Sequence, residues 1–129
     1  MTDTKKTIVL ADDESYIAIA YRDGLERAGF AVTVANNGQD ALGAISHIKP
    51  DIVLLDLIMP KMNGLEVLKA IKADPALSSI PVIVLSNLSQ VTDEAEVLRL
   101  GAADFLIKSD FSLKQIIEKV ESVLSTTEK

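Results

Sequence analysis

Cysteine and tryptophan are both absent from this 129-residue sequence. Without a thiol, the chain can form no disulfide, no thiolate metal site and no cysteine nucleophile. Aromatic residues make up only 4% of the composition, which argues against a nucleic-acid surface built from side chains that stack on bases. The formal net charge is -6, so polyanions are poor partners, whereas cations and basic protein surfaces remain possible. We therefore expect no direct contact with nucleic acid.

Long apolar runs are missing as well. No stretch approaches the ~20 residues that a membrane-spanning helix requires, and residues 1–6 lack the apolar core of a secretory signal peptide. We expect a cytoplasmic protein without membrane contact. The length suits one domain with one core, which we expect to span residues 1–129, with its folded core from about residue 6 to about residue 125.

Short aliphatic or β-branched runs alternate with stretches of helical spacing along the chain. The runs cover residues 7–11, 31–35, 52–55, 81–85 and 104–107. Strands that alternate with helices through short loops form parallel sheets with right-handed crossovers. The pattern predicts an α/β fold, in which a doubly wound five-stranded parallel sheet carries five helices on its two faces.

Local signals mark the ends of several of these helices. Gly29 follows the first helical stretch, and Gly101 follows the fourth, whose apolar positions begin at Val91. Ser112 and Gln115 stand at the spacing of a capping box before the fifth stretch. These signals predict helix boundaries close to the named residues.

The segment "DIVLLDLIMP", residues 51–60, joins a fully apolar run to a carboxylate. The run has no polar alternation, which is typical of a strand that is buried on both faces. Asp56 follows it directly. A carboxylate in apolar surroundings is costly unless it is paired, coordinated or used in chemistry.

Polar residues also follow the other predicted strands. In an open parallel sheet the carboxyl ends of the strands share one edge, where ligands bind. We therefore expect the following side chains to converge there: Asp12, Asp13 and Glu14 after the first strand, Asp56 after the third, Ser86 and Asn87 after the fourth, and Lys108 after the fifth.

Each of these residues has a simpler interpretation when taken alone. Asp12 or Asp13 could cap the following helix, and Ser86 could be an ordinary loop residue. Lys108 could be a surface lysine with a partly buried stem, and Asp56 a turn residue. Taken together, these interpretations would have to coincide at four strand ends of one sheet edge, so we favour a functional site.

The chemistry of the set points to phosphoryl transfer. Carboxylates that lie close together repel one another and favour a bound cation. Mg²⁺ prefers oxygen ligands and is commonly held by one or two carboxylates together with phosphate oxygens. A lysine and a hydroxyl beside such an ion would complement a transferring phosphoryl group. One of the carboxylates could then act as the nucleophile and form an acyl phosphate.

The sequence resembles the receiver domains of two-component response regulators along nearly its whole length. The matching stretches are "IVLADDE", "DIVLLDLIMPKMNGLEVL", "IPVIVLS" and "GAADFLIK". The resemblance implies a flavodoxin-like sheet with strand order 2-1-3-4-5. It also implies a signalling domain rather than a turnover enzyme, in which Asp56 accepts a phosphoryl group from a histidine kinase or a histidine phosphotransfer protein.

The resemblance further assigns a magnesium site. Asp13 and Asp56 would bind Mg²⁺ through their side chains, and Ile58 through its main-chain carbonyl. Asp12 would act mostly through a bound water.

The same resemblance assigns the switch residues. Lys108 would contact the phosphoryl oxygens, and Ser86 would move to hydrogen-bond one of them. Phe105 matches a rotating aromatic residue, although plain core packing explains it nearly as well. Gly64 matches the loop that shapes the site. Output partners would bind the fourth and fifth helices.

Two features depart from the family pattern, and two further positions bear on the lifetime of the phosphorylated state. Ser109 follows Lys108 where the family usually has proline, so we expect a trans peptide bond and a differently shaped loop. Asn87 is larger than the usual residue after the hydroxyl position. Ile58 and Leu88 are apolar where family members influence attack by water on the phosphoaspartate, which predicts a long-lived phosphorylated state.

Two alternatives remain at this point. The chain could be a non-phosphorylated interaction module that keeps the receiver fold, which Ser109 and Asn87 leave open. It could also be an aspartyl-phosphate phosphohydrolase, but such an enzyme needs a general acid where Ile58 stands. A receiver of this length would act through a partner protein or be one domain of a longer protein.

Overall fold

The computed structural model describes residues 5–87 and 94–127, and it contains one five-stranded parallel sheet in the order β2-β1-β3-β4-β5. This result confirms the predicted sheet and its strand order. The strands are β1 Thr7–Ala11, β2 Ala31–Ala35, β3 Ile52–Asp56, β4 Val82–Ser86 and β5 Asp104–Ile107.

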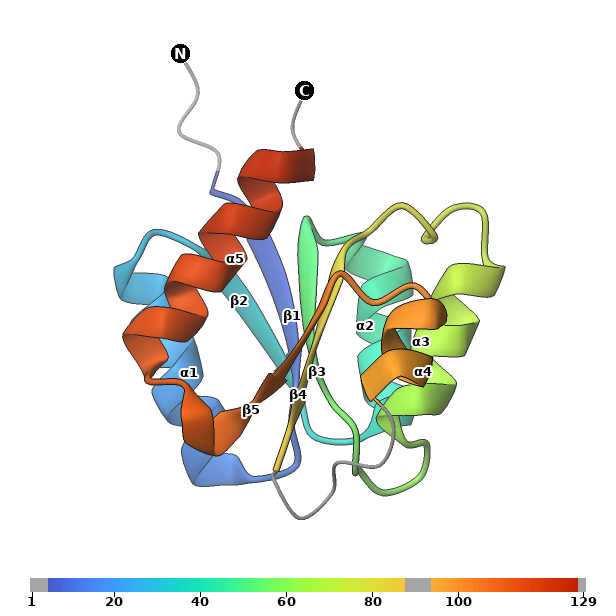
Figure 1. Cartoon of the computed structure of the whole chain (residues 1–129), viewed down its shortest axis with the longest axis horizontal. Coiled ribbons are helices and arrows are strands. Elements are labelled where there is room, and N and C mark those ends of the chain that lie inside the picture. The colour runs from blue at the N-terminus through green and yellow to red at the C-terminus, as the bar shows by residue number, and fades with distance from the viewer. Residues whose placement is uncertain (1–4, 88–93, 128–129) are drawn as a thin grey trace.

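Helices cover both faces of the sheet, so the domain has three layers (Figure 1). Helices α1 and α5 lie on one face, and α2, α3 and α4 lie on the other. Their bounds are α1 Ser15–Arg27, α2 Gly38–Ile48, α3 Gly64–Ala73, α4 Glu94–Arg99 and α5 Leu113–Thr127, with a short 3-10 turn at Lys108–Asp110. No helix in the described ranges is long and apolar enough to cross a membrane.

The side chains of each central strand divide between the two halves of the core. In β1, Val9 packs on the side of α2 and α3, while Ile8 and Leu10 pack on the side of α1 and α5. Every residue of β3 and β4 is buried. A strand that must fill both halves has no polar alternation, which explains the aliphatic runs at β3 and β4.

The two central strands each extend one residue further than predicted. Asp56 is the last residue of β3 and Ser86 the last residue of β4. Strand β4 also begins at Val82 rather than at Pro81, because proline has no N–H to donate to a neighbouring strand. Pro81 still accepts a hydrogen bond from the Val53 amide at 3.0 Å.

Most of the predicted helix signals have the expected role. Gly29 and Gly101 follow α1 and α4 with φ angles of +104° and +111°, which glycine adopts without strain. Ser112 and Gln115 form the predicted reciprocal hydrogen bonds, at 3.2 and 2.9 Å. The expected contribution of Val91 to the fourth helix lies outside the described residues.

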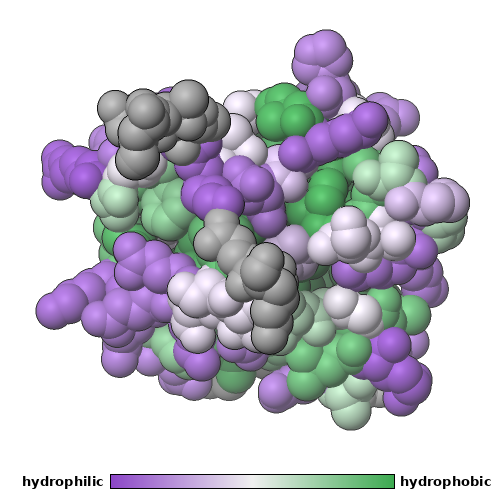
Figure 2. Space-filling view, turned by 90° about the horizontal axis from the view of Figure 1, so that it is seen from above, coloured by the Kyte–Doolittle hydropathy of each residue, from purple (hydrophilic) through white to green (hydrophobic). Residues whose placement is uncertain are grey.

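The predicted polar edge lies at one end of the sheet. The strands run towards the edge where β3 and β4 end, while the start of β1 and the end of α5 lie at the other edge (Figure 1). Figure 2 views that other edge, where hydrophilic and hydrophobic residues are mixed on the surface. The residues of the predicted functional site follow the strand ends at the polar edge.

Gly38 offers a test of how tightly the polar edge is packed. A Cβ atom at Gly38, the first residue of α2, would overlap the main-chain carbonyl of Met62. We expect Gly38→Ala to lower the free energy of unfolding by about 1–3 kcal/mol, because main-chain atoms would have to move. Gly43, in the same helix, has open space around it, so Gly43→Ala should raise stability by up to about 1 kcal/mol. Urea unfolding measures both, and equal effects would contradict the packing argument.

Candidate functional site

The sheet register brings the predicted residues to one edge. Ala11 pairs with Ala35 and with Leu55, so Asp12 and Asp56 follow aligned positions on neighbouring strands. Ser86 pairs with Ile107, the residue before Lys108. The predicted convergence of strand ends is therefore present in the structure.

Three carboxylates form a compact cluster at this edge. Asp12, Asp13 and Asp56 each offer an oxygen within 4.8 Å of the others. Asp12 and Asp56 are buried, at 1% and 3% exposure, whereas Asp13 is exposed. Oxygen ligands at this spacing suit a hard divalent cation, so these residues fit the predicted metal site.

The simpler capping interpretation of Asp12 and Asp13 does not hold. The N-cap residue of α1 is Glu14, whose side chain makes no capping hydrogen bond. The Oδ1 atom of Asp12 instead accepts a hydrogen bond from the Glu14 amide at 2.9 Å. This contact fixes the chain at the end of β1 and leaves the other Asp12 oxygen facing the site.

Among the described residues, Lys108 is the one cation that contacts this cluster. Its Nζ atom lies 2.9 Å from Asp12 Oδ2, 3.3 Å from Asp56 Oδ2 and 3.1 Å from Glu14 Oε1. The side chain is 7% exposed, so it is not a surface lysine. Burial alone would lower the pKa of Lys108, but the hydrogen bond to Asp12 and the charge of Asp56 raise it well above its usual value. The ammonium group therefore stays charged.

The ionised form of Asp56 is less well stabilised in this environment. Burial, with a smaller contribution from the charge of Asp12, raises the pKa of Asp56 to about 6. The charge of Lys108 and the main-chain amide of Ile58 oppose this rise in pKa. Among the described residues, the Oδ1 atom of Asp56 is the one buried side-chain polar atom without a hydrogen-bond partner. A buried carboxylate oxygen with no partner is costly, and it is placed to bind a cation or to attack an electrophile.

The two predicted switch residues, Ser86 and Phe105, are both buried. Ser86 is 0% exposed, and its hydroxyl donates to the Asn87 carbonyl at 3.1 Å. Phe105 is 6% exposed and belongs to the core on the side of α2 and α3, which agrees with the core-packing interpretation. Movement of either residue stays a prediction.

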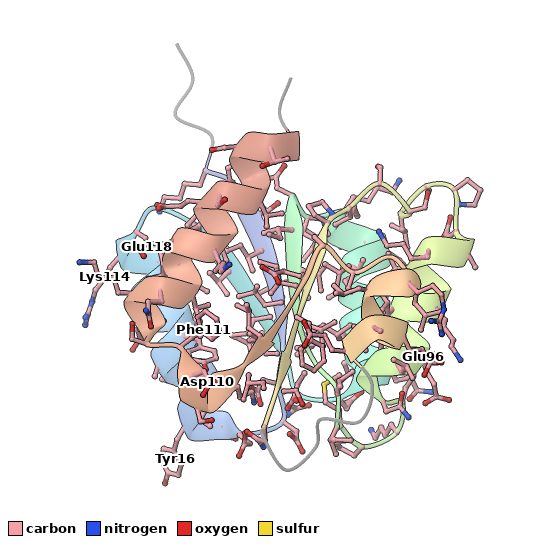
Figure 3. The ribbon with its side chains drawn as sticks, in the orientation of Figure 1. Tyr16, Glu96, Asp110, Phe111, Lys114 and Glu118 are labelled. Atoms are coloured by element: carbon pink, nitrogen blue, oxygen red, sulfur yellow. The ribbon has the colours of Figure 1, made fainter. Side chains whose placement is uncertain are left out.

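The segment after β5 has the expected departure from a proline-containing loop. No cis peptide bond occurs among the described residues, which confirms the expected trans bond between Lys108 and Ser109. Residues Lys108–Asp110 form a 3-10 turn, and Phe111 packs on the core on the side of α1 and α5. In Figure 3, Asp110 and Phe111 lie at the start of α5, above the first turn of α1.

The loop after β3 is tightly built. The Gly64 amide donates to the Leu57 carbonyl at 2.8 Å, and a Cβ atom at Gly64 would overlap the carbonyl of Asp56. The close packing at Gly64 therefore constrains the shape of this loop. Ile58 is 51% exposed on this loop, and its carbonyl stays a predicted ligand. Leu88 lies outside the described residues.

The sequence places Glu14 after the first strand but does not indicate its partner. In the structure Glu14 pairs with Lys108. One signal was available in the sequence. Glutamate is not among the residues that prefer the N-cap position of a helix, so its place there could have suggested another partner.

Comparisons with known proteins agree with this geometry. The family model of the response regulator receiver domain matches residues 8–121. The probable transcriptional regulator ycf27 of Guillardia theta is 35% identical over 98% of this chain and 48% of its own length. The alkaline phosphatase synthesis transcriptional regulatory protein PhoP of Bacillus subtilis is 32% identical over 95% of this chain and 50% of its own. The chain thus spans about half the length of these curated relatives.

A solved structure has the same fold over the whole domain. The receiver domain of the Francisella response regulator 1452 superposes with a TM-score of 0.86 and 31% identity, covering 96% of this chain and 100% of that one.

Replacing Asp56 tests how much the burial of its charged carboxylate destabilises the fold. Because its pKa of about 6 in the folded protein exceeds the ordinary value, folding favours the protonated carboxyl. The resulting penalty is absent below about pH 4 and complete above about pH 6. We expect Asp56→Asn to raise the free energy of unfolding by about 1–3 kcal/mol at pH 7.5, with little effect near pH 4. Urea unfolding across this range checks the difference, with Asp110→Asn as an exposed control. No gain at pH 7.5 would mean that Lys108 fully offsets the burial of Asp56.

Proposed function

The chain belongs to the response regulator receiver domain family, and we propose that it stores a signal as a phosphoryl group on Asp56. The observation that carries this assignment is the buried Oδ1 atom of Asp56, which has no hydrogen-bond partner in the described part of the chain and lies beside Lys108 and two further carboxylates. The donor would be a phosphohistidine of a histidine kinase or a histidine phosphotransfer protein. An oxygen of Asp56 would attack phosphorus while the bond from phosphorus to the histidine nitrogen breaks.

The cation that we infer for this reaction is Mg²⁺. Asp13 and Asp56 would hold it through their side chains, Ile58 through its main-chain carbonyl, and Asp12 through a water. When bound, the ion would offset the negative charge of the carboxylates and of the phosphoryl oxygens. The oxygen-only donor set supports this choice.

Lys108 and Ser86 would stabilise the transferred group. The ammonium of Lys108 is already fixed 3.3 Å from Asp56, so it can pair with a phosphoryl oxygen without being ordered first. The Ser86 hydroxyl donates to a main-chain carbonyl and would turn to the phosphoryl group instead. Phe105 would follow into the space that Ser86 leaves. These new contacts would bias a two-state equilibrium.

The activated state would be read by a partner through α4 and α5. Exposed acidic residues lie on both helices, among them Glu94, Glu118 and Glu121. We propose that residues 1–129 act as one receiver domain, in the cytoplasm, and that the output is performed by a partner protein or by another domain of a longer protein. The relatives of twice this length that are named transcriptional regulators support the second arrangement.

Chemical phosphorylation tests the acceptor. We expect acetyl phosphate and Mg²⁺ to add one phosphoryl group, because a small donor can reach Asp56 without a kinase. Intact-protein mass spectrometry should show the gain in the wild type and none in Asp56→Asn. Asp13→Asn should require more Mg²⁺ for the same extent. A gain that persists in Asp56→Asn would disprove the acceptor, no gain would support an inert interaction module, and steady phosphate release would support a phosphohydrolase.

The lifetime of the phosphorylated state tests the role of Ile58. Its apolar side chain cannot orient a water for attack on the acyl phosphate, so we expect the modification to last minutes or longer after the donor is removed. Ile58→Asn should shorten this lifetime, since an amide can hold a water by hydrogen bonding. Ile58 is half exposed, so the fold should tolerate the change. Loss of the phosphoryl group from the wild type within seconds would contradict the prediction.

A further inference from the structure

Glu14 is the one member of the charge cluster that the proposed function does not use. Its Oε1 atom lies 3.1 Å from the Lys108 ammonium, and its side chain is 44% exposed. The side chains of Asp12 and Asp56, the other two partners of that ammonium, are 0% and 4% exposed. Lys108 is therefore held by two inner carboxylates and by one outer carboxylate at the mouth of the site.

The local chain geometry aims Glu14 at Lys108 rather than at its own helix. Glu14 has the extended conformation of an N-cap residue, yet its side chain makes no capping hydrogen bond. Its amide is fixed by Asp12 Oδ1 at 2.9 Å. A Ser, Thr, Asp or Asn at this position would usually cap the helix. The carboxylate of Glu14 instead supplies a third acceptor for the three ammonium protons of Lys108.

We propose that Glu14 is a latch that holds Lys108 in the unphosphorylated arrangement and so opposes phosphorylation of Asp56. The inference rests on the proposed function of Asp56. A phosphoryl group there would bring up to about two negative charges and further acceptor oxygens. Because Lys108 already donates to three carboxylates, a phosphoryl oxygen has to compete with them for its ammonium protons. Glu14 is the outermost of the three, and its carboxylate can return to water at the lowest cost.

The latch also acts on the transfer step itself. With acetyl phosphate, a bond forms between an Asp56 oxygen and phosphorus, the bond from phosphorus to the acetyl oxygen breaks, and acetate leaves with the electron pair. No proton needs to move. The incoming donor is an anion, and Glu14 both occupies the cation that would attract it and adds a negative charge at the mouth of the site.

Beryllofluoride binding gives the most direct measurement. In the presence of Mg²⁺, the beryllium of a hydrated trifluoroberyllate gains an Asp56 oxygen and releases a water, which gives a stable mimic of the phosphorylated state. We expect Glu14→Gln to bind beryllofluoride about two- to fivefold more tightly than the wild type, as suits the loss of a partly exposed ion pair. Calorimetry or amide shifts in NMR spectra give the affinity. The rate of modification by acetyl phosphate should rise in the same direction.

Two further variants separate contact from charge. Glu26→Gln removes an exposed carboxylate from the same helix and should change the affinity by less than about twofold. Glu14→Asp keeps the charge, but its carboxylate is one methylene short of Lys108, so it should behave like Glu14→Gln. If Glu14→Asp matches the wild type, charge alone is responsible and the latch is wrong.

A titration with Mg²⁺ alone completes the test. We expect similar Mg²⁺ affinities for the wild type and Glu14→Gln. A weaker affinity in Glu14→Gln would make Glu14 part of the metal site and would overturn the latch, as would unchanged beryllofluoride binding. If neither protein binds beryllofluoride, or if binding persists in Asp56→Asn, the proposed function has failed.

Discussion

The site depends on one ammonium group that three carboxylates share. Lys108 is buried and within hydrogen-bonding distance of Asp12, Asp56 and Glu14. An unpaired charge at this depth would be very costly, and so would the carboxylates without it. The parallel register makes the pairing possible, because it aligns the carboxyl ends of β1, β3 and β5 at one edge. The fold and the charges of the site therefore constrain each other.

The same contacts affect Lys108 and Asp56 differently. Lys108 has three acceptors, and its pKa rises, whereas Asp56 has a pKa of about 6 and one oxygen without a hydrogen-bond partner among the described residues. Such a carboxylate weakens the fold and is available for chemistry. This is the usual relation between stability and function at reactive sites.

The aliphatic runs were sufficient to predict β1, β3 and β4, because strands buried on both faces show no polar alternation. The position of Asp56 and Lys108 after such runs was also sufficient to place them together at the polar edge. The direction of individual side chains could not be predicted. The sequence does not show that the Glu14 side chain contacts Lys108 instead of capping its own helix, or that the Ser86 hydroxyl donates to the Asn87 carbonyl. Those side-chain directions depend on backbone angles and on neighbouring residues that come together only in the folded protein.

Two glycines on different helices fix the loop that carries Ile58. Gly38 packs its backbone against Met62, and Gly64 packs against Asp56 and donates to Leu57. Asn63 and Glu66 cap the start of α3 with reciprocal hydrogen bonds of 2.9 Å. A segment held in this way has little conformational entropy left to lose when a ligand arrives. The loop is therefore ordered before any ion or phosphoryl group reaches it, and folding rather than binding bears the entropic cost of assembling the site.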